Sequence, residues 1–148
     1  MPDTHVAREV KIVRTVEPVA GPVPLQRRPS YQAFRLLQVG YVVLPIVAGA
    51  DKFFHWLTSW EMYLSSSVEK MLPIPAETFM RIAGGVEIAA GVLVAIAPRI
   101  GAWVVAAWLA AITVNLLLPP GYYDIALRDI GLIFGAVALG LLSRKYRK

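Results

Sequence analysis

Two ionisable residues inside one apolar stretch are the first candidates for chemistry. Arg81 and Glu87 interrupt the run FMRIAGGVEIAAGVLVAIA at residues 79–97. At about 1.5 Å per residue this run spans roughly 28 Å, which matches the hydrocarbon core of a bilayer. A charge at the centre of such a helix costs roughly 2.5 to 3.5 kcal/mol, so each group requires a partner, water or a route to the interface.

The spacing of these two residues directs the search for partners to other helices. They stand six positions apart, which places them about 120° from each other around a helix, so they cannot form an ideal intrahelical pair. Arg128 and Asp129 lie near the start of the last apolar run, and Asp51 closes the first. One predicted pair therefore joins Glu87 to Arg128. The other joins Arg81 to Asp129 or Asp51.

Three interpretations of this charged cluster stay open. The first is an ion-pair network that fixes the register of the helices. The second is a cavity open to the outer leaflet, in which arginine donates hydrogen bonds to a carbonyl-bearing head group such as a quinone, or to a small anion. The third is a proton relay through Glu87. The candidate ligand-binding residues are Arg81, Glu87, Arg128, Asp129 and His55.

Metal and covalent chemistry find little support in the residue types. The chain has no Cys, which excludes a thiolate nucleophile and a Cys-ligated cluster. Haem in a helical bundle usually takes two facing axial ligands, and His55 is the only histidine near a predicted span. We therefore expect no catalytic residue, no metal site and no cofactor held by this chain alone, with a quinone or a lipid as candidate ligands. His55 is interpreted as an interface residue, or alternatively as a ligand or proton donor.

Composition places the chain among membrane proteins. Its 148 residues are 57% hydrophobic and 17% charged, with a mean hydropathy of +0.57, which is too apolar for a soluble domain of this size. The net charge of +5 comes from basic residues that flank apolar runs, so we expect no nucleic-acid partner.

The predicted fold is all-α: an integral membrane four-helix bundle over residues 33–142. The spans are expected at about 33–50, 79–97, 100–118 and 125–142. In the intervening loop 51–78, apolar residues recur every three or four positions, which predicts an amphipathic helix lying in the membrane interface after the first span. Those residues are Phe53, Leu57, Trp60, Leu64, Val68 and Met71.

The two ends of the chain carry the topology signal. Residues 1–32 are rich in Pro and predict an extended arm, either disordered or strapped along a partner, and residues 143–148 form a basic tail. Eleven of the 15 Lys and Arg residues fall on the side of the two termini. By the positive-inside rule both termini are expected in the cytoplasm and loop 51–78 in the periplasm of a bacterial inner membrane.

Small residues predict where helices approach one another. The candidates are Gly84, Gly85 and Gly91 on the second span, and Gly131 and Gly135, a GxxxG pair, on the fourth. Such residues let backbones come close in lipid. They suit packing inside the bundle, a face for another subunit, or both.

Three motifs resemble the DoxX-like family of small four-helix bacterial membrane proteins. They are GADKF at 49–53, RIAGGVEIAAG at 81–91 and YYDIALRDIGL at 122–132. The resemblance covers residues 33–142 and implies a four-helix bundle. Some relatives are membrane subunits of quinone-linked oxidoreductases, including thiosulfate:quinone oxidoreductase, so the resemblance also implies a role of this kind.

The resulting hypothesis is an accessory, non-catalytic subunit of a larger respiratory or quinone-linked membrane complex. It would contact other subunits through the arm and the helix faces, contact membrane lipids, and help to shape a quinone or lipid site. The alternative is a stand-alone membrane oxidoreductase component or transporter that uses a buried Glu/Arg pocket.

Overall fold

Four long helices make up most of the molecule. The computed structural model describes residues 24–146, and the predictions for residues 1–23, 147 and 148 lie outside the described part. The long helices are α1 (Pro29–Phe54), α3 (Ala76–Ile96), α4 (Pro98–Leu117) and α5 (Tyr123–Tyr146). Each is long and apolar enough to cross a membrane. The all-α four-helix prediction is confirmed, and the chain has the build of a multi-pass membrane protein.

The outer helices extend further than the apolar runs alone predicted. Helix α1 begins at Pro29, so the end of the predicted extended arm, residues 29–32, is helical. Proline suits a first helical turn because its missing N–H would have no partner there. Helix α5 continues to Tyr146, which converts most of the predicted tail into helix. Both extensions pack together, because the rings of Tyr31 and Tyr146 lie 5.4 Å apart, edge to face.

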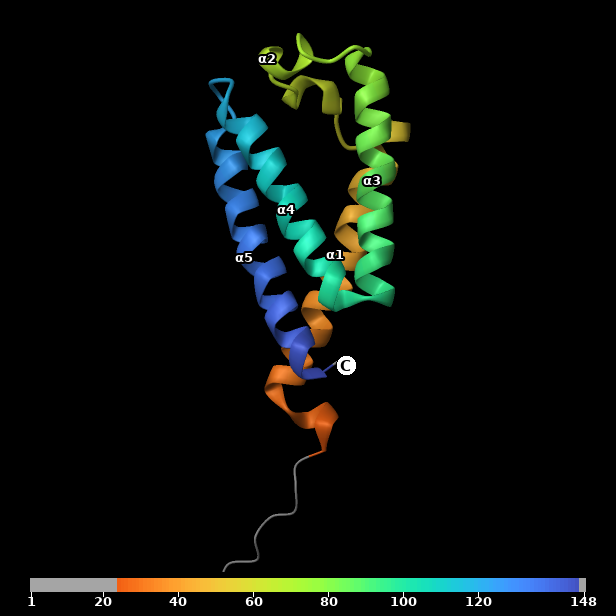
Figure 1. Ribbon diagram of the computed structural model, residues 1–148, viewed down its shortest axis with the longest axis vertical. Helices are drawn as coiled ribbons and strands as arrows, with labels where there is room; N and C mark the ends of the chain where they lie inside the picture. The colour runs from red at the N-terminus through yellow and green to blue at the C-terminus, as the bar shows by residue number, and fades with distance from the viewer. Residues whose placement is uncertain (1–23, 147–148) are drawn as a thin grey trace, which may run out of the picture.

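The helices form two close pairs, α1 with α3 and α4 with α5 (Figure 1). The pairs meet where α1 begins and α5 ends, which we call the terminal end, and they diverge toward the opposite loop end. Helices α3 and α4 connect through Ala97 alone, which makes them antiparallel neighbours. The buried core consists of Phe34, Tyr41, Ala90, Val94, Ala102, Val105, Ala106, Ala136 and Leu139.

Glycine sets the distance between α1 and α3. A Cβ added to Gly49 would lie 2.5 Å from the carbonyl oxygen of Gly84, and one added to Gly84 would lie 2.6 Å from that of Gly49. A Cβ on Gly91 would lie 2.7 Å from Cγ1 of Ile46. The two backbones therefore touch at these positions, where a larger residue would have to separate them.

The other three glycines singled out in the sequence behave differently. Gly135 faces the ring of Tyr41, which packs from α1 onto α5. A Cβ on Gly85 or Gly131 would meet open space. The GLIFG motif is thus a helix contact at its second glycine but not at its first.

The prediction of one amphipathic helix in the loop after the first span is wrong. Helix α1 ends at Phe54 because His55 adopts the left-handed conformation, with φ of 54°. The chain then forms two short elements, the 3₁₀ helix η2 (Trp60–Tyr63) and α2 (Ser66–Glu69). Asp51 explains the break, since its Oδ1 accepts the backbone N–H groups of Trp56 at 2.9 Å and Leu57 at 3.0 Å. These bonds turn the chain back over the end of α1.

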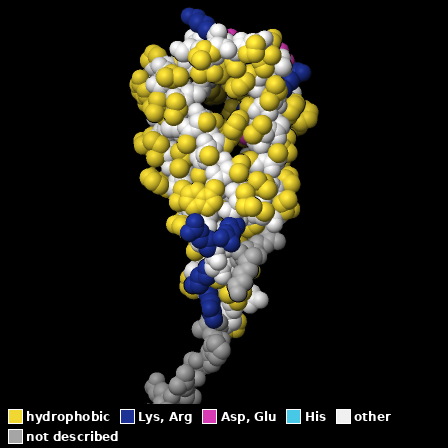
Figure 2. All heavy atoms as spheres, in the orientation of Figure 1, with side chains coloured by type: hydrophobic (Ala, Val, Ile, Leu, Met, Phe, Trp, Pro, Cys, Tyr) yellow, Lys and Arg dark blue, Asp and Glu magenta, His cyan; other side chains and the backbone are white. Residues whose placement is uncertain are grey.

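Apolar side chains cover the outside of the helices. The exposed fractions of Leu36, Leu127 and Phe134 are 76%, 69% and 70%. Figure 2 shows this apolar belt in yellow, with Lys and Arg side chains gathered beneath it at the terminal end. A surface of this kind faces lipid, because without a bilayer it would be a large unpaired hydrophobic patch.

Candidate functional site

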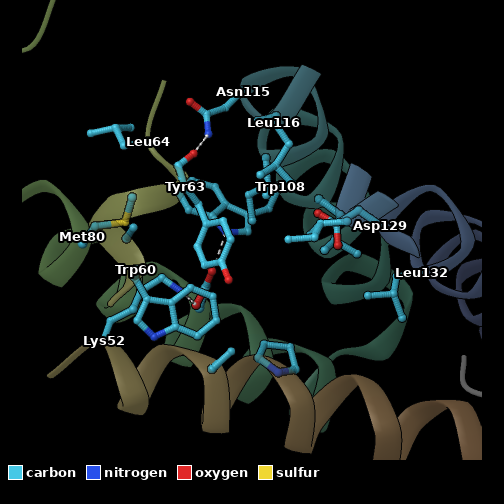
Figure 3. Close-up of a pocket in the computed structure, with 18 of the residues that line it drawn as sticks. Lys52, Trp60, Tyr63, Leu64, Met80, Trp108, Asn115, Leu116, Asp129 and Leu132 are labelled. Atoms are coloured by element: carbon cyan, nitrogen blue, oxygen red, sulfur yellow. Dashed lines mark hydrogen bonds and ion pairs between the residues drawn. The ribbon is translucent and has the colours of Figure 1, made fainter. Parts of the chain in front are cut away.

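A cavity of about 690 Å³ lies between the two helix pairs at the loop end. Figure 2 shows a dark hollow in this part of the molecule, and Figure 3 shows the side chains around it. Its walls are mostly aromatic and aliphatic, and its volume falls within the range of small-molecule sites, roughly 300 to 1,000 Å³. The lining includes Tyr41, Leu44, Ala48, Trp60, Tyr63, Met80, Glu87, Trp108, Leu109, Ala111, Val114, Leu118, Arg128, Asp129 and Leu132.

A buried ion pair joins α1 to α3 at the cavity wall. Lys52 Nζ lies 2.6 Å from Oε2 of Glu87, and the two side chains are only 5% and 8% exposed. The other carboxylate oxygen, Oε1, accepts a long hydrogen bond of 3.4 Å from Nε1 of Trp108 on α4. The ammonium group also lies 3.7 Å from the ring centre of Trp60, a cation–π distance. Both charges are therefore compensated, as buried charges must be.

This pairing corrects the prediction that Glu87 pairs with Arg128. The contact between Gly49 and Gly84 brings α1 and α3 together, and Lys52 and Glu87 each follow one of these glycines by three residues. In antiparallel helices those positions are offset along the axis by roughly 9 Å, from ~1.5 Å per residue. Side chains lean toward the N-terminus of their own helix, so the two lean toward each other and close this offset.

Asp51 holds the tryptophan that covers the lysine. Its Oδ2 accepts a hydrogen bond of 2.7 Å from Nε1 of Trp60, while its Oδ1 binds the backbone N–H groups described above. The side chain of Asp51 is buried, and these three donors compensate its charge. Asp51, Trp60, Lys52 and Glu87 thus form one connected polar cluster beneath the loop.

The segment between α1 and α3 forms a roof fixed to α4 and to the turn between α4 and α5. Asn115 on α4 accepts the backbone N–H of Ser65 at 3.0 Å and donates to the carbonyl of Tyr63 at 2.7 Å. The hydroxyl of Tyr122 donates to the carbonyl of Met62 at 3.0 Å. The rings of Tyr63 and Tyr122 also meet edge to face at 5.3 Å. The roof is therefore attached to both helix pairs.

Two polar groups are left to face the cavity. Figure 3 shows Asp129 projecting from α5 toward the space, opposite Tyr63 and Trp60. Within residues 24–146, no hydrogen bond or ion pair engages the Asp129 carboxylate or the Tyr63 hydroxyl. A bound molecule would meet one hydrogen-bond acceptor and one donor at these positions.

Two residues predicted for the site, Arg81 and Arg128, pair with acidic residues on their own helices. Arg81 pairs with Glu77 one turn earlier, at 2.8 Å with both side chains more than half exposed, so the predicted partners Asp129 and Asp51 are wrong for it. Arg128 borders the cavity, but its side chain is 76% exposed and lies 3.4 Å from Asp124. A partner four residues away on the same helix is within reach however the helices pack, which explains why these arginines pair locally and not across helices.

His55 also lies outside the cavity lining, at the end of α1. Its Nε2 lies 3.0 Å from Oε1 of Glu61 in η2, and both side chains are about 30% exposed. The backbone N–H of Glu61 and the hydrogen bond from His55 hold the pKa of the Glu61 carboxyl below its usual value. Of the predicted set, the structure therefore brings Glu87, Arg128 and Asp129 to one cavity and leaves Arg81 and His55 outside it.

Sequence reasoning missed most of the residues that shape the site. Lys52, Trp60, Tyr63, Trp108 and Asn115 were not among the candidates. One signal was available for Lys52: it ends the first apolar run on the same side of the membrane as the start of the second, where a buried carboxylate required a cation. Trp60 carried no such signal, because its spacing fitted a simple amphipathic helix, and Trp108 was one apolar residue among many in the span expected at 100–118.

Neither a metal site nor a similar known protein indicates the function of the cavity. Among residues 24–146 no group of three His, Asp or Glu side chains could hold a metal ion. Comparison of the chain with family models, with curated protein sequences and with solved structures gave no match. The cavity itself is therefore the basis on which function is argued.

Proposed function

We propose that this protein is an integral membrane subunit that binds a quinone-type amphiphile between its two helix pairs. The observation that carries the proposal is the cavity of about 690 Å³, with aromatic walls and a few polar groups, at one end of four apolar helices. Ligand sites of this composition hold a flat apolar body and fix its orientation through a small number of hydrogen bonds.

The chemistry of the walls fits a quinone ring. Trp60, Tyr63 and Trp108 offer aromatic surfaces, and aromatic pairs prefer stacked or edge-to-face contact. The Tyr63 hydroxyl can donate to a quinone carbonyl, and Asp129 can accept from a hydroxyl of the reduced ring. This arrangement replaces the predicted role of arginine as the donor, since Arg81 and Arg128 are already paired on the surface.

The position of the cavity fits a ligand that enters from the lipid. Leu44, Val114 and Leu118 line the cavity and are also 55%, 61% and 53% exposed. Leu44 belongs to α1, Val114 to α4, and Leu118 directly follows α4; they mark where the cavity reaches the apolar surface. A long apolar tail could leave through this opening while the ring stays inside.

The protein would form part of a larger membrane complex. The motifs that resemble the DoxX-like family support an accessory subunit of a respiratory or quinone-linked complex in a bacterial inner membrane, with electron transfer carried by cofactors of other chains. The basic terminal end supports an orientation with both termini in the cytoplasm. The cavity then opens toward the outer leaflet.

A stand-alone oxidoreductase component or transporter is the second candidate, and it has less support. It relied on a buried Glu/Arg pocket, whereas Glu87 pairs with Lys52 and Arg128 pairs with Asp124. Purification in mild detergent separates the two candidates. Stoichiometric comigration with chains that absorb as haem, flavin or iron–sulfur proteins favours the subunit, and a lone homo-oligomer favours the second candidate.

Ligand binding is tested by tryptophan quenching with a short-chain benzoquinone. Ala111 lines the cavity from α4, whereas its neighbour Ala110 does not, and both are exposed small residues. We expect saturable quenching in the wild type and in Ala110→Phe, and at least tenfold weaker binding in Ala111→Phe. Linear, non-saturable quenching that is the same in all three proteins would refute the quinone site.

A further inference from the structure

A second pocket lies at the terminal end, and on α1 its lining ends at Gln38, about one turn before Tyr41 of the first cavity. Its volume is about 370 Å³, and it is lined by Tyr31, Phe34, Arg35, Gln38, Ala95 and Tyr146. Its walls come from α1, from the last turn of α3 and from the end of α5. It contains a cationic side chain, Arg35, and a buried amide, Gln38.

The buried amide belongs to Gln38, which is 5% exposed. Its Nε2 donates to the carbonyl oxygens of Val94 at 3.3 Å and Ala95 at 3.4 Å, in the last turn of α3. The carbonyl of Val94 lacks the usual helical donor because Pro98, four residues later, has no N–H. Gln38 therefore caps α3, and this role fixes the direction of its side-chain oxygen.

That oxygen orients Arg35. Gln38 Oε1 accepts a hydrogen bond of 2.9 Å from Nη1 of Arg35. Because the amide is buried and held by two carbonyls, the guanidinium is anchored at the pocket, and within residues 24–146 no other hydrogen bond or ion pair engages it. A planar guanidinium with free donors is well suited to bind the oxygens of a phosphate.

The charge around this pocket has one sign in the described part of the chain. Within residues 24–146 the terminal end carries six basic residues: Arg27, Arg28, Arg35, Arg99, Arg144 and Lys145. None of the seven acidic residues of that range lies at the terminal end, and Glu87, near the middle of α3, comes nearest to it along that helix. The seven are Asp51, Glu61, Glu69, Glu77, Glu87, Asp124 and Asp129. Figure 2 shows the basic side chains directly below the apolar belt. In a bilayer, the head-group phosphates border the hydrocarbon core, next to such a belt.

We propose that the pocket at Arg35 binds the phosphate of an anionic phospholipid. The aromatic walls contact the apolar part of the lipid next to the head group, and Arg35 binds the phosphate oxygens. The surrounding arginines and lysine favour an anionic lipid over a zwitterionic one, because basic pockets between membrane helices attract anionic head groups.

The test measures lipid binding to the full-length protein in neutral detergent. Phosphatidylglycerol is titrated against phosphatidylcholine, and bound lipid is counted by native mass spectrometry. Arg35→Gln is the test variant. Arg81→Gln is the matched control, since Arg81 is an exposed arginine at the opposite end. Arg35→Lys keeps the charge but loses the planar fork, and retained thermal stability in phosphatidylcholine reports that each variant is folded.

We expect the wild type and Arg81→Gln to bind phosphatidylglycerol at least tenfold more tightly than phosphatidylcholine. Arg35→Gln should lose about tenfold in affinity, and Arg35→Lys should fall between the two. Equal binding of both lipids, or an Arg35→Gln variant that binds as the wild type does, would overturn the proposal. Inorganic phosphate that displaces the lipid at micromolar concentration would also overturn it, by indicating a site for free phosphate.

Discussion

The ion pair between Lys52 and Glu87 allows the most direct test of how this bundle is held together. Replacing Glu87 by Gln leaves an ammonium group that is 5% exposed without a carboxylate. Removing one partner of a buried pair costs about 3–5 kcal/mol, because the remaining charge has lost its compensation. The ring of Trp60, 3.7 Å from the ammonium, offsets part of this loss.

The expected effect on thermal stability follows from the size of the chain. For domains of about 150–250 residues, 1 kcal/mol corresponds to roughly 2–4 °C in Tm, so Glu87→Gln should lower Tm by roughly 6–20 °C. The double variant Lys52→Met with Glu87→Leu replaces both charges by apolar groups and should recover most of that loss. Arg81→Gln breaks an exposed pair and should cost less than about 1 kcal/mol.

The assay is thermal unfolding in one fixed detergent, followed by tryptophan fluorescence and by size-exclusion chromatography of the heated sample. Wild type, Lys52→Met, Glu87→Leu and the double variant form a double-mutant cycle, which isolates the energy of the pair. Glu87→Gln is measured beside the cycle. Glu87→Gln with wild-type stability would contradict the reasoning. So would a double variant whose loss equals the sum of the two single losses.

Three further predictions concern the roof and the α1–α3 contact. The pKa of the Glu61 carboxyl is held below its usual value near 4.5. The stability that its bonds contribute is therefore present above pH 4.5 and is lost as the pH falls through the lower pKa of the folded state. Glu61→Gln should remove this acid-dependent contribution, at most about 1 kcal/mol, which a curve of Tm against pH would show. Gly84→Ala places a Cβ 2.6 Å from a carbonyl oxygen of α1 and should destabilise the protein by about 1–3 kcal/mol. Gly85→Ala is the control, because its Cβ meets open space and should leave the stability unchanged. Equal Tm values for the two variants would refute the backbone contact. Asp51→Ala removes the acceptor of Trp60 and of two backbone N–H groups, so hydrogen exchange in the loop after α1 should rise at least tenfold, and unchanged protection would show that the roof is held by other contacts.

The helices were predictable because the signal for each is local. Apolar runs of membrane-crossing length are complete in the sequence, and the structure places its four long helices on them with ends shifted by a few residues. The gap of only two residues between the spans expected at 79–97 and 100–118 likewise predicted a tight connection of two antiparallel helices. The error in the loop came from Asp51, whose carboxylate binds backbone groups five and six residues later and so overrides the helical spacing of the apolar residues.

The candidate site was predictable only as a region. Ionisable residues were expected to gather at one end, and Glu87, Arg128 and Asp129 do border a single cavity there. The partner of Glu87 was not predictable from spacing, because Lys52, Arg81 and Arg128 were all cations at similar depth. The partner of Arg81 was accessible from the sequence, since Glu77 lies four residues earlier, a spacing that places both on one helix face.

Sequence alone determined that this chain makes four apolar helices with basic ends and a charged opposite side, because hydropathy and charge belong to each residue wherever it lies. Tertiary structure decided which charges meet and where space remains. Gly49 and Gly84 bring α1 and α3 into backbone contact, which selects Lys52 as the partner of Glu87. The divergence of the two helix pairs then leaves the cavity, a property of how helices pack that no single segment contains.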